Sequence, residues 1–126
     1  MITEDYISFE IAKLLKEKGF DEGCRARYGT AGSFSYEKYE IESGGCEIHN
    51  AILAPTIQMV MKWLRHVHGL HIAILWDCGA YIGKDSFCYH ISDMNNYENK
   101  GWYKIGFESY EEACEAAIRY CLENLI

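Results

Sequence analysis

Three of the five histidines in this 126-residue chain lie within six positions, at His66, His68 and His71, inside "WLRHVHGLHIAIL". Histidine and cysteine are the residue types that bind zinc, through imidazole nitrogens and thiolates. On a helix, however, His66 and His68 point about 200° apart, and His71 follows a glycine onto a predicted strand. The cluster therefore predicts no shared ion: we expect His68 to pack near the end of the helix and His66 to face water.

A second metal hypothesis combines Cys88 and His90, which share one face of a predicted strand at positions i and i+2. In the hairpin predicted below, His71 lies about 26 Å along the strand from His90, and Cys78 points to the other face. Two ligands are too few for a closed zinc site. We expect neither a metal nor a cofactor, although a site in the glycine-rich segment stays open through Cys24, Cys46 and His49.

No motif in the chain assigns a catalytic residue. The stretch "GTAG" at 29–32 lacks the Gly-Lys-Ser/Thr of a phosphate loop, and no serine lies in a Gly-x-Ser-x-Gly elbow. The carboxylates of Glu111, Glu112 and Glu115 are expected on a solvated helix face. Enzyme activity is therefore neither predicted nor excluded.

The charge balance disfavours nucleic acid and anionic membranes as partners. Nineteen acidic residues against twelve basic ones leave a formal charge of −7, which repels phosphate groups. Residues 55–124 follow the helix, three strands, helix order of double-stranded RNA-binding domains, but the final helix begins with Ser109, Tyr110, Glu111 and Glu112, where those domains place lysines. We expect no nucleic-acid partner.

The chain is expected to be cytoplasmic, with no membrane partner. No apolar run approaches the ~20 residues that span a bilayer, and the first twenty residues do not follow the pattern of a signal peptide. Reduced thiols are then the expectation for the six cysteines. Cys114 and Cys121, seven positions apart on a predicted helix, lie ~10 Å apart along its axis, beyond disulfide reach.

The periodic patterns predict a single α+β domain over 1–126, with a three- or four-stranded antiparallel sheet and about three helices largely on one face. Helices are expected at 4–18 after a Thr3 cap, at 55–68, and at 110–124 after Ser109. Strands are expected at 33–41, 70–82, 87–92 and 102–107.

The two central strands are predicted to form a hairpin around "GKDS" at 83–86, with Ile82 opposite Phe87. This register places one set of apolar residues on a shared buried face: Ile72, Ile74, Trp76, Ala80, Ile82, Phe87, Tyr89 and Ile91. The third strand is predicted to alternate Tyr103, Ile105 and Phe107 on one side. Ala73 and Leu75 lie on the outer face, which therefore needs a cover as well.

Met59, Trp63 and His66 are spaced i, i+4, i+7 on the helix at 55–68, away from its predicted core stripe of Ile57, Val60, Met61, Leu64, Val67 and His68. Tryptophan and methionine are enriched at protein interfaces. These three residues form the candidate interaction site. The alternative is that the segment 21–54 covers them.

The final helix, "SYEEACEAAIRYCLENLI", and the block "APTIQMVMKWLRHVHGLHIAIL" resemble short hypothetical proteins that recur in genomes of anaerobic gut bacteria, often near mobile elements. The match is weakest over residues 21–50. The resemblance implies a small bacterial accessory protein and assigns no role to any residue.

The favoured function is a non-enzymatic protein-interaction or adaptor module. It is expected to bind a protein partner or to associate with itself, through the Met59, Trp63 and His66 side or the outer sheet face. The alternative is a small-molecule-binding protein or small enzyme, whose pocket is framed by residues 21–50 and the aromatic side chains of Tyr81, Tyr89, Trp102 and Tyr103.

Overall fold

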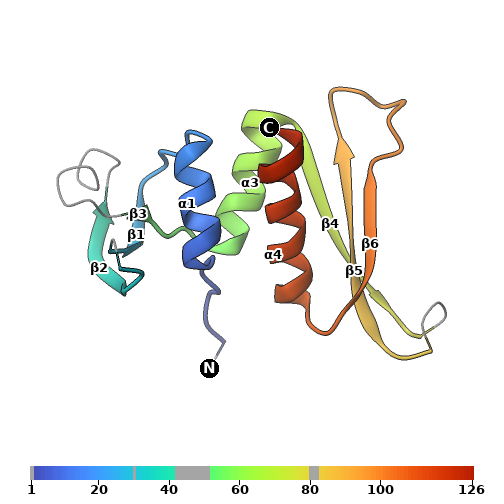
Figure 1. Ribbon diagram of the computed structural model, residues 1–126, viewed down its shortest axis with the longest axis horizontal. Helices are drawn as coiled ribbons and strands as arrows, with labels where there is room; N and C mark the ends of the chain where they lie inside the picture. The colour runs from blue at the N-terminus through green and yellow to red at the C-terminus, as the bar shows by residue number, and fades with distance from the viewer. Residues whose placement is uncertain (1, 30, 42–51, 80–82) are drawn as a thin grey trace. The chain divides into compact units, whose positions relative to one another are not determined.

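The computed structural model describes residues 2–29, 31–41, 52–79 and 83–126, without the side chains of 37–41 (Figure 1). The chain divides into two compact units, Met1–Thr56 (unit 1) and Ile57–Ile126 (unit 2). Each unit combines helix with a three-stranded antiparallel sheet, which confirms the predicted α+β class. A single domain over the whole chain stays a prediction.

Unit 1 contains α1 (Phe9–Glu17), β1 (Cys24–Tyr28), β2 (Phe34–Ile41) and β3 (Ile52–Leu53). The strand order is β2-β1-β3, so that β1 is central. The sequence predicted β2 at 33–41 but neither β1 nor β3. Both missed strands are short, and β1 carries a register shift between Cys24 and Ala26 that interrupts its alternation.

Helix α1 begins later than the sequence predicted. Its N-cap is Ser8, whose hydroxyl accepts a hydrogen bond of 3.3 Å from the backbone N–H of Ile11, and not Thr3. The chain before Ser8 is extended, and the backbone N–H of Ile7 donates to the carbonyl of Pro55 at 3.2 Å. Together with the isolated bridge between Tyr6 and Thr56, this bond commits the backbone around Ile7 to an extended pairing, so a helix over the same residues cannot form.

Aromatic rings tie α1 to the hairpin formed by β1 and β2. Neighbouring ring centroids lie 5.2 to 6.4 Å apart in tilted and edge-to-face pairs. The rings belong to Tyr6, Phe9, Tyr28, Phe34 and Tyr36. Burial raises the pKa of Tyr6, which indicates that the cluster excludes water from part of that phenol.

Unit 2 contains α3 (Ile57–His68), β4 (Leu70–Asp77), β5 (Ser86–Asp93), β6 (Trp102–Phe107), α4 (Tyr110–Tyr120) and the π-helical turn η1 (Cys121–Leu125). These elements confirm the predicted helices and the strands β5 and β6, whereas β4 ends five residues before the end of the predicted strand at 70–82. The strand order is β4-β5-β6. Helix α3 contacts β4 and α4, and α4 contacts all three strands from one side (Figure 1).

The predicted β4–β5 hairpin has the correct side-chain faces, but its predicted register is wrong. Trp76, not Ile82, lies opposite Phe87, a shift of 82 − 76 = 6 positions. Because side chains alternate with a period of two, an even shift keeps every residue on its predicted face. The strand ends at Asp77, where its Oδ1 accepts the backbone N–H of Gly79 at 3.1 Å and starts a turn. Ala80 to Ile82 lie outside the described residues.

The sheet therefore has two faces of different character. The face toward the helices, called the inner face, carries Ile72, Ile74, Trp76, Phe87, Tyr89, Ile91, Trp102 and Phe107. The opposite face, called the outer face, carries His71, Ala73, Leu75, Asp77, Ser86, Cys88, His90, Ser92 and Tyr103. Ile91 is 0% exposed and packs in the core with Ala117 and Ile118 of α4, which are also 0% exposed.

Strand β6 contains a bulge that the alternation pattern does not predict. Two steps on β5, from Phe87 to Tyr89, face three steps on β6, from Phe107 to Lys104. Gly106, at φ +95°, has the left-handed conformation that such bulges use. The extra residue moves Phe107 to the inner face, where its ring stacks on Tyr89 at 5.7 Å. The prediction that Phe107 shares a face with Tyr103 is therefore wrong.

Candidate interaction surface on strand β4

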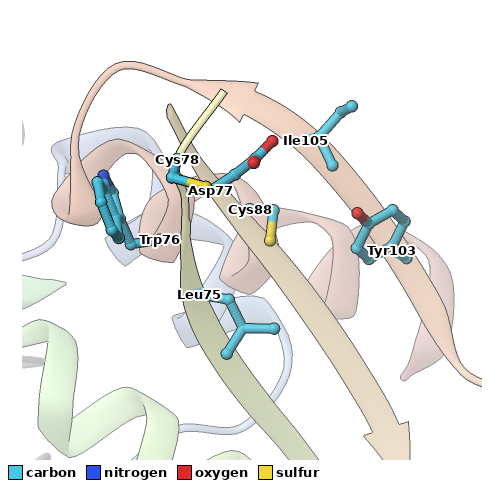
Figure 2. Close-up of a pocket in the computed structure, with 7 residues that line it drawn as sticks. All are labelled: Leu75, Trp76, Asp77, Cys78, Cys88, Tyr103 and Ile105. Atoms are coloured by element: carbon cyan, nitrogen blue, oxygen red, sulfur yellow. The ribbon is translucent and has the colours of Figure 1, made fainter. Parts of the chain in front are cut away.

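A hollow of about 750 Å³ lies on the outer face, near the end of β4 (Figure 2). Leu75, Cys88, Tyr103 and Ile105 form most of its wall, and Asp77 and Cys78 lie at the end nearest the β4–β5 turn. Leu75 and Cys88 are directly opposite each other across the two strands. The hollow is thus built from side chains that three neighbouring strands project in the same direction.

The hollow combines an apolar wall with a single carboxylate. The carboxylate of Asp77 is 9% exposed and its Oδ1 is engaged by the Gly79 N–H. Cys78 is exposed and Cys88 is buried, but the described lining residues include no histidine or lysine that could activate a thiol as a base. An apolar side chain or a small cation fits this mixture of apolar wall and single carboxylate.

The more unusual feature is the exposure of β4 itself. Leu75 and Trp76 are consecutive residues that point to opposite faces, yet they are 53% and 61% exposed. Figure 2 shows Trp76 on one side of the strand and Leu75 on the other. A strand end that exposes large apolar groups on both faces has a substantial surface for a partner to bury.

The alternation pattern predicts Trp76 on the buried face, and its exposure contradicts that expectation. The face was right, but the strand was predicted to continue to residue 82, which would have put Trp76 in the middle of the sheet. Since β4 ends at Asp77, Trp76 lies at the end of the strand. Leu75 was correctly placed on the outer face.

The two edges of this sheet differ. Strand β4 is one edge and β6 the other. From Leu70 to Trp76 the sequence "LHIAILW" has no charged residue, proline or glycine, and its pairing with β5 runs without interruption. Strand β6 carries Lys104 and the bulge at Gly106, two features that obstruct pairing with a further strand. The uncharged run in β4 is the sequence signal that could have identified this surface.

The predicted interaction residues on α3 do not form one exposed patch. His66 is exposed, Met59 is half-buried and Trp63 is 7% exposed. The Trp63 ring lies edge-on to His68 at 4.8 Å. Val67, predicted in the core stripe, is 58% exposed, so the buried stripe of α3 is rotated toward Trp63. A partner at Met59 and His66 stays a prediction.

The register shift changes the placement of the histidines on the outer face. His71 lies opposite Ser92 and Ala73 lies opposite His90, so the two histidines are near neighbours and not about 26 Å apart. The His90 ring is engaged through Nε2 with the carbonyl of Lys100 at 3.1 Å and through Nδ1 with the Ser92 hydroxyl at 3.5 Å. His90 therefore holds the loop before β6 in place.

No group of three or more histidine, cysteine, aspartate or glutamate side chains that could hold a metal ion occurs among the described residues. Cys24 is buried and its thiol donates to the carbonyl of Ala26 at 3.3 Å, while Cys46 and His49 lie outside the described residues. Cys121 is 0% exposed, and burial raises its pKa to about 12. That thiol is unsuited to nucleophilic chemistry.

The aromatic residues proposed to frame a pocket do not share a face. Tyr89 and Trp102 belong to the inner face. The centroids of their rings lie 6.5 and 6.4 Å from the centroid of the Tyr120 ring. Tyr103 is on the outer face and is 57% exposed. Tyr81 lies outside the described residues. The outer-face hollow therefore includes Tyr103 of this set but neither Tyr89 nor Trp102.

Comparison with protein-family models, with curated proteins and with solved structures finds no match for this chain. Within the residues that the structure describes, no helix has the length and hydrophobicity needed to cross a bilayer. The site's own geometry is therefore the basis for any proposal about its function.

Proposed function

We propose that this protein is a non-enzymatic protein-interaction module that associates with itself through the exposed end of β4. The observation that supports it is the exposure of Leu75 and Trp76 on opposite faces of one edge strand, at 53% and 61%. Fully burying a leucine side chain contributes about 1.5 to 3 kcal/mol, of which about half is still available at Leu75 because it is 53% exposed. Tryptophan is also among the residues that most often dominate binding energies.

The distribution of charge permits a second copy as the partner. The chain carries a formal charge of −7, so two copies repel each other over most orientations. Between Leu70 and Trp76 there is no formal charge, and this strand is therefore a place where two copies can meet with little repulsion. A partner selected by its positive charge would instead bind an acidic surface. This role is consistent with the small bacterial accessory protein that the resemblance implies.

The test is the molar mass in solution, measured by light scattering between about 1 and 500 µM, the range in which weak dimers form. We expect the mass of the wild-type protein to rise toward that of a dimer. Leu75→Glu should weaken association by at least about tenfold, because it places a charge in the contact. Met94→Glu adds the same charge at a residue that is 54% exposed outside β4, and should leave association unchanged.

A constant monomer mass over the whole range would exclude self-association. Equal association of Leu75→Glu and wild type would exclude β4 as the contact. His66→Glu tests the alternative contact on α3 in the same series: weakened association in this variant, with an unaffected Leu75→Glu, would move the site to that helix.

Binding of a small cation is the second candidate, because the hollow combines the Asp77 carboxylate with the Tyr103 ring. Benzylamine is a suitable probe, since it has an ammonium group and an apolar ring. Trp76 also lines the hollow, so binding should quench or shift the intrinsic tryptophan fluorescence, and Asp77→Asn should abolish the change. Identical titrations for both proteins would exclude this role for the carboxylate.

A further inference from the structure

We infer that β4 pairs edge to edge, in antiparallel orientation, with β4 of a second copy, so that two three-stranded sheets become one of six strands. The inference rests on the proposed self-association and specifies how it occurs. It follows from the opposite directions of Leu75 and Trp76, from the place of β4 at the edge of the described sheet, and from the fit of the strand to its own sequence.

The directions of the exposed side chains favour an edge contact. A partner that docked on the outer face would cover Leu75 and leave Trp76 in water, and one on the inner face would do the reverse. A strand placed alongside β4 in the plane of the sheet has side chains on both faces. It therefore buries both residues at once.

The backbone of β4 can accept such a strand. The sheet order places β5 on one side of β4, and no other described strand pairs with it. In an edge strand, every second N–H and C=O points away from the sheet and bonds to water or to an added strand. The interruptions that block the β6 edge, Lys104 and the Gly106 bulge, have no counterpart between Leu70 and Trp76.

The sequence also restricts the register, and we choose the centring that places His71 opposite Asp77. In a two-fold antiparallel pair that continues one sheet, opposite residues lie on the same face, so their numbers add to an even sum. Centring the segment His71–Asp77 on Ile74 pairs it over its full length. Ile72 is then opposite Trp76 of the second copy, and Ala73 is opposite Leu75. His71 is opposite Asp77 of the second copy, so an imidazole faces a carboxylate at each end of the paired strands.

The first experiment is amide hydrogen exchange measured by NMR on the full-length protein at low and high concentration. Pairing should slow exchange at alternate residues of β4, those whose N–H groups point away from β5, by about tenfold or more once most copies are dimeric. The amides of β6, the opposite edge, serve as the internal control and should not change. Association without this alternating protection would overturn the inference and leave the proposed self-association intact.

The second experiment tests the register by disulfide trapping. In a background with Cys46→Ser and Cys78→Ser, the variant Ile74→Cys places two thiols directly opposite each other at the two-fold axis. Ile72→Cys is the matched control on the same face, because its two copies are offset by four residues, about 13 Å, beyond disulfide reach. We expect a covalent dimer from Ile74→Cys alone under mild oxidation.

The outcomes separate the two proposals. A monomer at every concentration removes both the self-association and the strand pairing, and would also be the result if a foreign extended peptide were the natural occupant. Protection of β4 amides with trapping at residue 72 or at neither position contradicts the stated pairing. If Ile74→Cys fails to fold, as judged by circular dichroism, the exchange pattern of the wild type still decides whether β4 pairs.

Discussion

The hydroxyl group of Tyr28 donates a hydrogen bond of 2.6 Å to the backbone carbonyl of Ile7. This bond links the end of β1 to the extended segment before α1. Ile7 is 0% exposed, so its carbonyl depends on protein partners and not on bulk water. The bond is therefore a fixed point in the packing of α1 on the sheet of unit 1.

We expect Tyr28→Phe to lower the free energy of unfolding by about 1 kcal/mol, because it leaves that carbonyl without the hydroxyl donor. Chemical denaturation provides the measurement. The control is Tyr36→Phe, which removes a hydroxyl from the same aromatic cluster at a side chain that is 53% exposed. Its effect should stay below about 0.5 kcal/mol. Equal losses in the two variants would contradict a specific role for the Tyr28 bond.

The N-cap of α1 can be located by mutation. Ser8→Ala should destabilise the protein by about 1 kcal/mol, because the N–H of Ile11 loses its side-chain acceptor. Thr3→Ala should have almost no effect, since Thr3 is exposed and lies outside the helix. Thermal unfolding of the two variants checks this. A larger effect at Thr3 would place the start of the helix where the sequence pattern predicted it.

Two glycines with nearly the same backbone conformation should respond differently to alanine. Gly83 and Gly101 have φ of +78° and +81°, so both substitutions introduce backbone strain of about 1 to 2 kcal/mol. A Cβ at Gly83 meets nothing within 4 Å, whereas one at Gly101 collides with the carbonyl oxygen of Ile91 and the ring of His90. Gly101→Ala should therefore cost at least about 2 kcal/mol more in denaturant titrations. Similar values would argue against this packing of the loop before β6.

The pKa of Cys121 predicts a loss of stability at alkaline pH. Its folded-state pKa, about 12, lies above the ordinary value of 9.0. Below pH 9 both states keep the proton and the contribution is constant. Above pH 9 the unfolded chain ionises first, so stability should fall by about 2 kcal/mol by about pH 10.5.

Cys121→Val should reduce this pH dependence, while Cys78→Ser, at an exposed thiol, should leave it unchanged. Burial also raises the pKa of Tyr89, so part of the alkaline loss should persist in Cys121→Val. The measurement is the free energy of unfolding at pH 8, 9 and 10.5. A wild-type protein that is equally stable across this range would contradict the burial of Cys121.

The elements of unit 2 could be predicted because each has a strong local signal. The Ser109 hydroxyl accepts the N–H of Glu112 at 3.0 Å, as its spacing indicated. The Glu112 carboxylate accepts the N–H of Glu108, one residue before the expected partner. Alternating apolar residues identified β5 and β6 to within a residue or two.

The hairpin register could not be predicted from alternation. A period of two is satisfied equally by shifts of two, four or six residues, so the correct faces gave no information about which residues pair. The deciding interaction is local: the Asp77 carboxylate and Gly79 start the turn five residues earlier than "GKDS" suggests. The separation of about 26 Å predicted between His71 and His90 depended on that register and was wrong for the same reason.

The candidate site was harder to predict than the fold. The importance of Leu75 and Trp76 depends on where β4 ends and on its place at the edge of the sheet, and strand order depends on tertiary structure. The α3 residues were chosen from a helical wheel. Such a wheel gives the direction of each side chain about the helix axis but not which elements pack against it. Trp63, predicted on the exposed side, is buried.

The chain-order pairing of β4, β5 and β6 has a kinetic consequence. Each strand of that sheet pairs with the next strand in the sequence. Formation of the sheet therefore requires closure of only the short loops between consecutive strands. In unit 1, by contrast, Tyr28 must meet Ile52, and the entropy of bringing distant segments together slows such steps. We expect refolding to proceed from the C-terminal half toward the N-terminal half, with amides of β5 protected before those of β1 in pulse-labelling experiments.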